Sequence, residues 1–307
     1  MTAPRKSAQR LCAFAIVVLA LCSLTPYVPV SVFLTDIPSH FVLQYAIGCV
    51  VLSAATLWLR LRHFYFLLLG IAFALNMASL APYFDRHIAQ RLPAQNFKVL
   101  QANVLTQNRN TALLETMIEQ EKPDIIVLAE INDAFRAMAS DLKPQYPYQT
   151  MRHKVALLSR HPAVNVSADP ALYKAAHISA LTVTFDNQTI DIVTLHTPTP
   201  LQNLSRRDAE LAEVADFIGT RKNHVIFAGD INATPWCPAV QHFAAQTGLT
   251  SARRHQGVLP SWPRWLPASF LRIPIDHIFV DPRLIVLDYR LGSSIGSDHL
   301  PTIGIFG

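Results

Sequence analysis

The sequence has little charge and few cysteines for its length. Only 15% of its 307 residues are charged, whereas 51% are hydrophobic, and the mean hydropathy is +0.25. Ordinary globular chains carry about 25% charged residues, so part of this chain does not face water. The hydrophobic content excludes a disordered chain, and four cysteines in 307 residues exclude a disulfide scaffold.

The small surplus of basic residues is confined to the first third of the chain. Lys and Arg number 26, against 21 Asp and Glu. Residues 1–93 carry seven basic and two acidic groups, whereas residues 94–307 carry 19 of each. Proteins that coat nucleic acid rely on many Lys and Arg side chains. The pI of about 9.1 therefore does not indicate such a protein, because the surplus lies in the hydrophobic third.

Three long stretches of this first third contain no charged residue. They are residues 11–35, 37–59 and 64–84. About 20 apolar residues suffice for a helix to cross a hydrocarbon core of roughly 30 Å. We therefore expect three transmembrane helices, at about residues 11–34, 39–59 and 64–84. They would form a transmembrane region over residues 1–92, followed by a soluble domain over residues 93–307.

The first stretch has a second interpretation, because Pro26 and Pro29 are expected to end or kink its helix. A short apolar helix preceded by Arg5, Lys6 and Arg10 also resembles a signal peptide. No clear small-x-small cleavage site precedes Pro26. This favours a retained helix over a cleaved one.

The basic residues also predict the orientation of the helices. The N-terminal tail has three Lys or Arg and residues 60–63 have two, whereas residues 36–40 have none. Such residues favour the cytoplasmic side. We therefore expect a multi-pass protein of a bacterial inner membrane, with the N-terminus in the cytoplasm and the soluble domain on the periplasmic side. The lipid bilayer is then one partner, and Cys237, alone in the soluble domain, can form no internal disulfide.

The soluble part alternates between strand and helix patterns. Strands are predicted at residues 97–103, 124–130, 155–158, 178–185, 190–196, 224–230, 275–280, 284–289 and 302–306. Helices are predicted at residues 111–120, 134–142, 205–218 and 238–246. The second strand is so apolar that both of its faces must be buried, and Asp186-Asn187 predicts a hairpin turn. The mixture indicates sheets covered by helices.

Polar residues stand where several of these strands end. Asn103, Glu130, His196 and Asp230 each close a predicted strand. Alternate residues of an extended segment share a face, so Asp230 and Asn232 should point the same way. Taken singly, each has an ordinary structural explanation, as a turn residue, a solvated cap or a satisfied core histidine. Together they form a set that is harder to explain by structure alone.

Two further groups lie near the end of the chain. Asp276 alternates with Ile278 and Val280, and a carboxylate on that apolar face is costly unless it is paired. An imidazolium is the obvious partner, whereas the neighbouring His277 should point away. Asp298-His299 follows a glycine-serine turn, and on its own could be an ordinary surface pair.

This collection of side chains predicts a reaction. Carboxylates and amides bind hard cations such as Mg²⁺ through oxygen, and histidines can donate hydrogen bonds to a charged transition state. Together these groups indicate metal-assisted attack of water on phosphorus.

The soluble domain resembles the endonuclease/exonuclease/phosphatase superfamily. The resemblance is carried, in that family's order, by residues 101–104, 123–130, 158–162, 195–197, 229–232, 275–278 and 297–301. The GDxN segment and the terminal SDHxP segment together are its most specific part. The closer likeness is to the membrane-anchored branch, which has hydrophobic helices ahead of the catalytic domain. The resemblance implies an α/β (α+β) fold, a four-layer αββα sandwich of two packed β-sheets with helices outside.

The resemblance also assigns a metal site. Glu130 would be the principal ligand of Mg²⁺, for which Mn²⁺ could substitute, with Asn103 and Asp298 close to the metal. Many nucleases of the family have a second acidic residue just after the first-strand Asn. Here residues 104–106 are Val, Leu and Thr, which leaves open whether one or two metals are held.

The catalytic roles follow in the same way. Asp230 would orient or deprotonate the attacking water, and Asn232 would hold a phosphate oxygen. His196 and His299 would stabilise the transition state, with Asp276 fixing the ring and charge of His299.

Other residues have less specific interpretations. Trp262, Trp265 and Arg272 either line the cleft or contact the membrane interface. Arg206 and Arg207 are expected on a solvated helix face. Cys237 is expected to be a small residue at the start of a helix.

Three functions compete. The leading hypothesis is a membrane-anchored, metal-dependent phosphoesterase that acts on a lipid headgroup or a small phosphodiester or monoester. The second is a nuclease of the same chemistry, against which the zero net charge of the domain argues mildly. The third is a catalytically inactive membrane module kept for interaction. The sequence predicts neither the substrate nor the oligomeric state.

Overall fold

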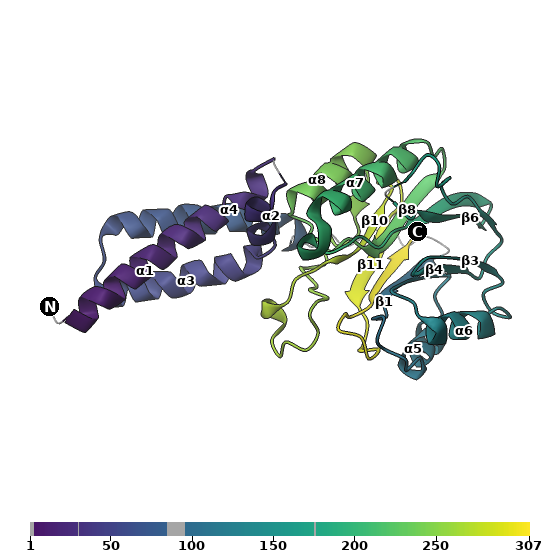
Figure 1. Ribbon diagram of the computed structural model, residues 1–307, viewed down its shortest axis with the longest axis horizontal. Helices are drawn as coiled ribbons and strands as arrows, with labels where there is room; N and C mark the ends of the chain where they lie inside the picture. Colours follow the sequence, from purple (N-terminus) through teal and green to yellow (C-terminus); the bar gives the residue numbers. More distant parts are fainter. Residues whose placement is uncertain (1–2, 30, 85–95, 175) are drawn as a thin grey trace.

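The computed structural model describes residues 3–29, 31–84, 96–174 and 176–307. Figure 1 shows a bundle of long helices at one end of the molecule and a larger α/β domain at the other. The predicted boundary between the two regions, at residues 92 and 93, lies outside the described residues.

Three helices of the described chain are long and apolar enough to cross a membrane. The bundle consists of α1 (Ala3–Cys22), α3 (Val42–Leu59) and α4 (His63–Phe84). The last two match the predicted spans closely. The first helix ends at Cys22, ahead of the two prolines, and a 3-10 turn (Thr25–Tyr27) and the short α2 (Phe33–Ser39) follow it. The first candidate span covers Pro4–Tyr27, earlier in the chain than the predicted residues 11–34. Its helix ends near the two prolines as expected, because proline lacks the N–H that would continue the helix.

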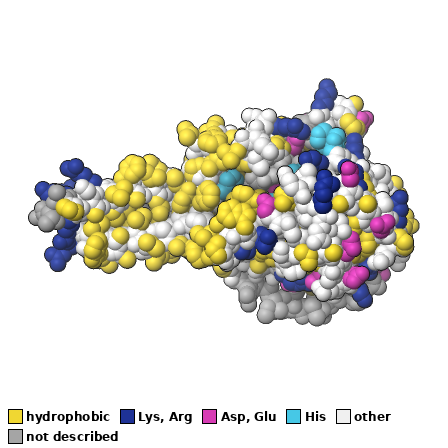
Figure 2. Space-filling view, turned by 60° about the horizontal axis from the view of Figure 1, so that its bottom comes forward, with side chains coloured by type: hydrophobic (Ala, Val, Ile, Leu, Met, Phe, Trp, Pro, Cys, Tyr) yellow, Lys and Arg dark blue, Asp and Glu magenta, His cyan; other side chains and the backbone are white. Residues whose placement is uncertain are grey.

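The side chains of the bundle divide into a small interior and a broad apolar exterior. Ile16, Cys49 and Leu69 are buried between the helices. Outward-facing apolar side chains cover the rest of the bundle in Figure 2. Basic side chains gather at the end far from the α/β domain (Figure 2), where Gln9 Nε2 donates to the Leu59 carbonyl at 2.9 Å. The N-terminal tail and the α3–α4 loop thus lie at the same end.

The α/β domain contains two six-stranded sheets. The first has the order β11 (Val286–Leu291), β12 (Thr302–Phe306), β1 (Phe97–Asn103), β2 (Ile125–Ala129), β4 (Val155–Ser159) and β3 (Tyr148–Arg152). The second has the order β5 (Ala163–Asn165), β6 (Ser179–Phe185), β7 (Gln188–Thr194), β8 (His224–Asp230), β10 (Asp276–Val280) and β9 (Thr250–Ser251). Asp186 and Asn187 join β6 to β7 with positive φ angles of 47° and 62°, as a tight hairpin turn requires.

Helices cover the outer face of each sheet (Figure 1). The first sheet carries α5 (Ala112–Glu121) and α6 (Asp133–Asp141), and the second carries α7 (Pro200–Gly219) and α8 (Pro238–Thr247). This arrangement confirms the predicted four-layer αββα sandwich. The helices match their predicted positions within a few residues, because each presents an apolar stripe to a sheet.

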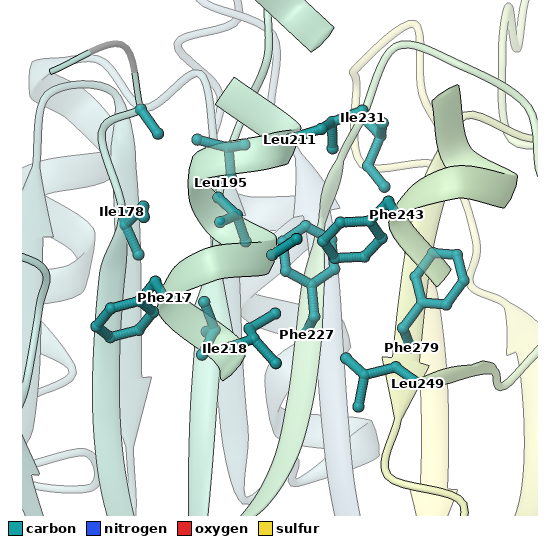
Figure 3. Close-up of a cluster of buried hydrophobic side chains, with 14 of the residues drawn as sticks. Ile178, Leu195, Leu211, Phe217, Ile218, Phe227, Ile231, Phe243, Leu249 and Phe279 are labelled. Atoms are coloured by element: carbon teal, nitrogen blue, oxygen red, sulfur yellow. The ribbon is translucent and has the colours of Figure 1, made fainter. Parts of the chain in front are cut away.

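Apolar side chains fill all three spaces between these layers. Between the sheets, Val127 of β2 packs in one cluster with Ile226 and Ile278, while Leu128 of β2 faces the outer helices. Every residue of β2 is buried, as its continuous apolar run predicts. Figure 3 shows the cluster under α7 and α8, where Phe227, Phe243 and Phe279 are labelled. Burial of each such side chain stabilises the fold by roughly 1.5–3 kcal/mol.

The directions of the strands bring the ends of several strands to one edge of the sandwich. β1 runs parallel to β2, with Asn103 beside Ala129, and β7 runs parallel to β8. β10 runs antiparallel to β8 and begins at this same edge, with Asp276 opposite Asp230. Parallel strands end together, so the polar residues that close them meet here.

A buried polar cluster joins the helical region to the α/β domain beside this edge. We call Asp36, His40, Arg207 and Cys237 the junction cluster. Arg207 donates to both carboxylate oxygens of Asp36, at 3.0 and 2.6 Å, and both side chains are fully buried. His40 Nε2 and Cys237 Sγ, each 3.2 Å away, also donate to this carboxylate. Burial would raise the pKa of Asp36, but the bonds from His40 and Arg207 outweigh it and hold the pKa well below its usual range.

The position of Arg207 corrects one prediction. Arg206 is exposed, as predicted, and pairs at 2.8 Å with Glu210, which is buried. Arg207 instead turns inward to Asp36, 171 residues away in the chain. A buried guanidinium needs a charged partner, and helix periodicity cannot reveal one supplied by another region. Cys237 occupies the predicted place, at the start of α8.

Candidate functional site

Seven of the eight predicted site residues lie in one connected set of polar contacts at this edge. They are Asn103, Glu130, His196, Asp230, Asn232, Asp276 and His299. These residues come from both sheets, because strands of each sheet end or begin at this edge.

Asn103 connects the two sheets at the centre of the site. It is the last residue of β1, and its Nδ2 donates to Glu130 Oε1 at 3.0 Å and to Asp230 Oδ2 at 2.9 Å. Its own Oδ1 accepts from the Leu105 backbone N–H at 3.0 Å. The amide therefore fixes the separation between a carboxylate of the first sheet and one of the second.

Glu130 is held in place by the loop that follows Asn103. It comes directly after β2 with a φ of 60°, and its Oε2 accepts from both the backbone N–H and the hydroxyl of Thr106, each at 3.0 Å. Burial would raise the pKa of Glu130, but the bonds from Asn103 and Thr106 outweigh it and lower the pKa below its usual value. Its side chain is 24% exposed, so an ionised carboxylate faces the site.

Asp230 and Asp276 lie opposite each other in register and are both fully buried. Burial, followed by the charge of Asp276, raises the pKa of Asp230 to about 6. Burial would raise the pKa of Asp276 too, but the charge and hydrogen bond of His299 lower it. Two adjacent carboxylates thus have pKa values shifted in opposite directions, which separates a proton acceptor from a permanent anion.

His299 supplies the partner that the sequence predicts for Asp276. Its Nδ1 lies 2.8 Å from Asp276 Oδ2, and its Nε2 lies 3.8 Å from Asp230 Oδ2. Burial would lower the pKa of His299, but the charges of Asp276 and Asp230 outweigh it and raise the pKa to about 10. The ring is therefore an imidazolium near neutral pH. His277 points away, as predicted, and its Nε2 donates to the Ala233 carbonyl at 2.7 Å.

His196 and Asn232 also lie beside Asp230. His196 Nε2 lies 3.6 Å from Glu130 Oε1 and 3.8 Å from Asp230 Oδ2. Asn232 Nδ2 lies 3.5 Å from the same nitrogen and donates to the Thr197 carbonyl at 2.8 Å. The expectation that the chain stays extended to Asn232 is wrong. Its φ is 53°, and its backbone N–H bends back to Asp230 Oδ1 at 2.9 Å.

Asp298 lies outside this set of contacts. Its Oδ2 accepts from Trp262 Nε1 at 3.0 Å, and the Trp262 ring lies 6.4 Å from the His299 ring. Within the described ranges, no hydrogen bond or ion pair joins Asp298 to Glu130 or Asn103. It is half-buried beside His299, next to the site rather than within the network.

Several supporting residues were missed by sequence reasoning. Gln101 Nε2 donates to Asp276 Oδ1 at 2.9 Å, and Gln101 Oε1 accepts from the Thr302 hydroxyl at 2.8 Å. Thr106 holds Glu130, as described above. Lys154 Nζ lies 3.4 Å from the Thr106 hydroxyl. The one available signal was Gln101, a polar residue inside the first strand pattern.

The donor set suits a hard divalent cation. Glu130, Asn103 and Asp298 are carboxylates and an amide, whose oxygens are the ligands that Mg²⁺ prefers; Asn103 here turns its Nδ2 toward Glu130 and its Oδ1 toward the Leu105 N–H. A second group, Asp230, Asp276 and His299, has ligand atoms within 4.8 Å of one another. That group is already satisfied by an imidazolium between two carboxylates, whereas the half-buried Glu130 presents a carboxylate that could hold a cation.

The match to a family model decides the relationship. The model of the endonuclease/exonuclease/phosphatase family matches residues 100–299, which is more than half of the chain and includes every site residue above. The chain belongs to this family. Family members are hydrolases that act on phosphate esters. No curated protein sequence matches the chain at a significant level.

Solved structures of the endonuclease/exonuclease/phosphatase family share the fold. TDP2 of D. rerio in complex with a single-strand DNA product has a TM-score of 0.56 and 16% identity, over 69% of this chain and 99% of that one. The human nocturnin catalytic domain has a TM-score of 0.52 and 20% identity, over 69% of this chain and 94% of that one. A family protein from Beutenbergia cavernae has a TM-score of 0.55 and 19% identity, over 69% of this chain and 71% of that one. These likenesses show the common fold.

Proposed function

We propose that the protein is a membrane-anchored, metal-dependent phosphoesterase. One observation carries the proposal. Asn103 donates hydrogen bonds simultaneously to two carboxylates: Glu130, which is ionised and half-buried, and Asp230, which is buried and has a raised pKa. The first is suited to a cation and the second to accepting a proton from water. The leading substrates are a lipid headgroup or a small phosphodiester, because a neutral domain tethered to a bilayer meets them first.

The proposed metal ligands are Glu130, Asn103 and Asp298, with Mg²⁺ as the cation and Mn²⁺ as a substitute. A bound cation would supply Lewis-acid polarisation of a phosphoryl oxygen. Glu130 is oriented for this by Thr106, and Asp298 by Trp262.

The proposed chemistry of the chain's own groups follows from their positions. Asp230, with its pKa raised to about 6, accepts the proton of the attacking water. His299, held as an imidazolium by Asp276, donates to the phosphoryl oxygens as charge develops. His196 and Asn232, which lie 3.5 Å apart beside Asp230, hold the other oxygens.

The hydrolysis of phosphate esters by the full-length protein tests this proposal. The assay compares a phospholipid, a chromogenic phosphodiester and a phosphomonoester, with Mg²⁺, Mn²⁺ or Ca²⁺ and with a chelator. We expect turnover with Mg²⁺ that the chelator abolishes and added Mg²⁺ restores. Absence of turnover on every ester would contradict the proposal and favour the inactive interaction module.

Thr106 offers a sharper test of the proposed metal site. Replacing Thr106 with Val removes the hydroxyl that donates to Glu130 Oε2. Loss of a group that orients a ligand typically weakens metal affinity about 10–100-fold, so half-maximal activity should need that much more Mg²⁺. The matched control is Thr116→Val, because the Thr116 hydroxyl bonds only to its own helix. An unchanged Mg²⁺ requirement in Thr106→Val would remove Glu130 from the metal site.

The membrane topology is also a proposal. The tail and the α3–α4 loop carry the basic residues at one end of the bundle, and the α/β domain lies at the other. We infer a cytoplasmic N-terminus and a periplasmic catalytic domain in a bacterial inner membrane. Alkaline phosphatase fused after Gly307 should be active in cells, whereas a fusion in the α3–α4 loop should not. The reverse pattern would invert the orientation.

A nuclease is the second candidate, and one observation favours it. Arg152, His153 and Lys154 form the β3–β4 turn beside the site, and a fold neighbour was solved with a single-strand DNA product. Binding through such side chains weakens steeply with salt. Mg²⁺-dependent cleavage of single-stranded DNA that falls steeply between low and physiological salt would therefore support a nuclease. Equal cleavage at both salt concentrations would argue against this interface.

A further inference from the structure

One loop of the α/β domain is apolar, exposed and held against the helical bundle. Trp262 and Ile273 pair by two backbone hydrogen bonds, at 3.0 and 2.6 Å, and close a loop of residues 263–272. We call this segment the tryptophan loop. Its tip exposes Trp265 (67%), Phe270 (49%) and Leu271 (41%). A monomeric soluble surface seldom gathers large apolar side chains in this way.

The tryptophan loop is fastened to the start of a membrane-spanning helix. Gln44, in the first turn of α3, donates from Nε2 to the carbonyls of Phe270 and Arg272, at 2.9 and 3.0 Å. Figure 1 shows the loop in yellow-green beside the domain end of α3. The candidate membrane span of α3 begins at Val42, so the loop lies at the level where that span begins.

The composition of the tryptophan loop fits the boundary between lipid headgroups and acyl chains. It has two basic residues, Arg264 and Arg272, and no acidic residue. Tryptophan is enriched at this depth of a bilayer, and basic groups are attracted to anionic headgroups. An apolar tip with basic flanks is therefore suited to a lipid surface.

The other side of the same segment contacts the candidate site. Trp262 Nε1 donates to Asp298 Oδ2 at 3.0 Å. Arg264 donates from its backbone N–H to the Asp298 carbonyl at 2.7 Å, and from Nε to the Ser297 carbonyl at 2.8 Å. The segment thus connects α3 to the residue next to His299.

We propose that the tryptophan loop inserts Trp265, Phe270 and Leu271 into the lipid surface and fixes the mouth of the site at headgroup level. The partner is the bilayer that the bundle spans, so the inference rests on the proposed membrane anchoring. The two ends of the loop segment then have separate tasks. The tip contacts lipid, and Trp262 and Arg264 hold Asp298.

Quenching of tryptophan fluorescence by brominated lipids tests this proposal. The full-length protein is placed in nanodiscs of phosphatidylcholine and phosphatidylglycerol, with bromine near the headgroup end of the acyl chains. The background is Trp58→Phe, because Trp58 lies on α3 and is 78% exposed. We expect strong quenching in this background and its loss when Trp265→Phe is added. Equal quenching with and without Trp265 would overturn the proposal.

Two controls separate failure of this proposal from failure of the anchoring. Trp265→Phe alone retains Trp58, whose quenching reports that the bundle contacts lipid. Lack of quenching there would overturn the anchoring itself. Ile285→Trp in the Trp58→Phe/Trp265→Phe background places an indole at the opposite edge of the sandwich, at a side chain that is 46% exposed. This control should remain unquenched, and quenching there would show that the signal is not specific to the loop.

The alternative partner of the tryptophan loop is a second copy of the chain. Trp265→Ser should leave the size of the purified particle unchanged if the loop binds lipid. A dimer that dissociates on this substitution, without lipid quenching of Trp265, would assign the loop to self-association and overturn the proposal.

Discussion

Replacing Asp230 with Asn should lower kcat by about 10²–10⁴-fold, the usual contribution of a positioned base. The amide keeps the shape of the carboxylate but cannot take a proton from water. Asp230 is fully buried, accepts from Asn103 and Asn232, and has a pKa raised to about 6 by burial and by the charge of Asp276. The measurement is kcat of the full-length protein on a soluble phosphodiester at saturating Mg²⁺.

A matched control for this substitution is Asp281→Asn. Asp281 follows β10 at the opposite end from Asp276 and pairs with exposed Arg283. Its replacement should leave kcat unchanged. The Mg²⁺ requirement of Asp230→Asn is measured alongside kcat, because Asp230 accepts from Asn103, one of the proposed ligands. A loss of less than tenfold in kcat would remove Asp230 from the role of base.

Replacing Asp36 with Ala should destabilise the α/β domain by up to about 3 kcal/mol, the lower end of the usual cost of removing one partner of a buried ion pair, because Asp208 still accepts from Arg207 at 2.7 Å. Arg207 is fully buried and donates to both oxygens of Asp36. His40 and Cys237 lose the same acceptor. The measurement is the thermal unfolding midpoint of the full-length protein, followed by the fluorescence of Trp236, which lies beside the junction cluster.

The control for this prediction is an exposed ion pair. Asp288 lies 3.1 Å from Arg290, and their side chains are 40% and 38% exposed. Asp288→Ala should change stability by about 1 kcal/mol or less, as surface pairs generally do. The double variant Asp36→Leu/Arg207→Met removes both buried charges, so it should be more stable than Asp36→Ala. If Asp36→Ala unfolds at the same temperature as Asp288→Ala, the buried pair does not secure the junction.

The sequence predicted the main elements of the fold because local pattern and tertiary role agree in them. β1, β8 and β12 match their predicted bounds, since each is a largely apolar run, and β1 and β8 end at a polar residue. β3 was missed because it is an edge strand with polar Gln149 and Arg152. β9 has only two residues and presents no pattern to detect.

The candidate site was predictable from the sequence to a similar extent as the fold. Its principal residues close strands, and the ends of parallel strands meet whatever the details of packing. Gln101 and Thr302 were not predicted, because they meet only through the register of β1 against β12. The same holds for Arg207, whose partner belongs to the helical region. Pairings that depend on register or on distant segments leave no periodic trace in a sequence.

The junction cluster determines what the α/β domain loses when it is separated from the helical region. His40 Nδ1 accepts from the Thr234 backbone N–H at 3.3 Å, and Trp236 Nε1 donates to the His40 carbonyl at 3.2 Å. Both belong to the turn that follows Asp230 and Asn232. A fragment that begins after α4 would lack these contacts and Asp36, and would leave Arg207 with Asp208 as its carboxylate partner. We therefore expect the isolated α/β domain to be less stable than the full-length protein, with the turn beside the candidate site losing its support from the helical region.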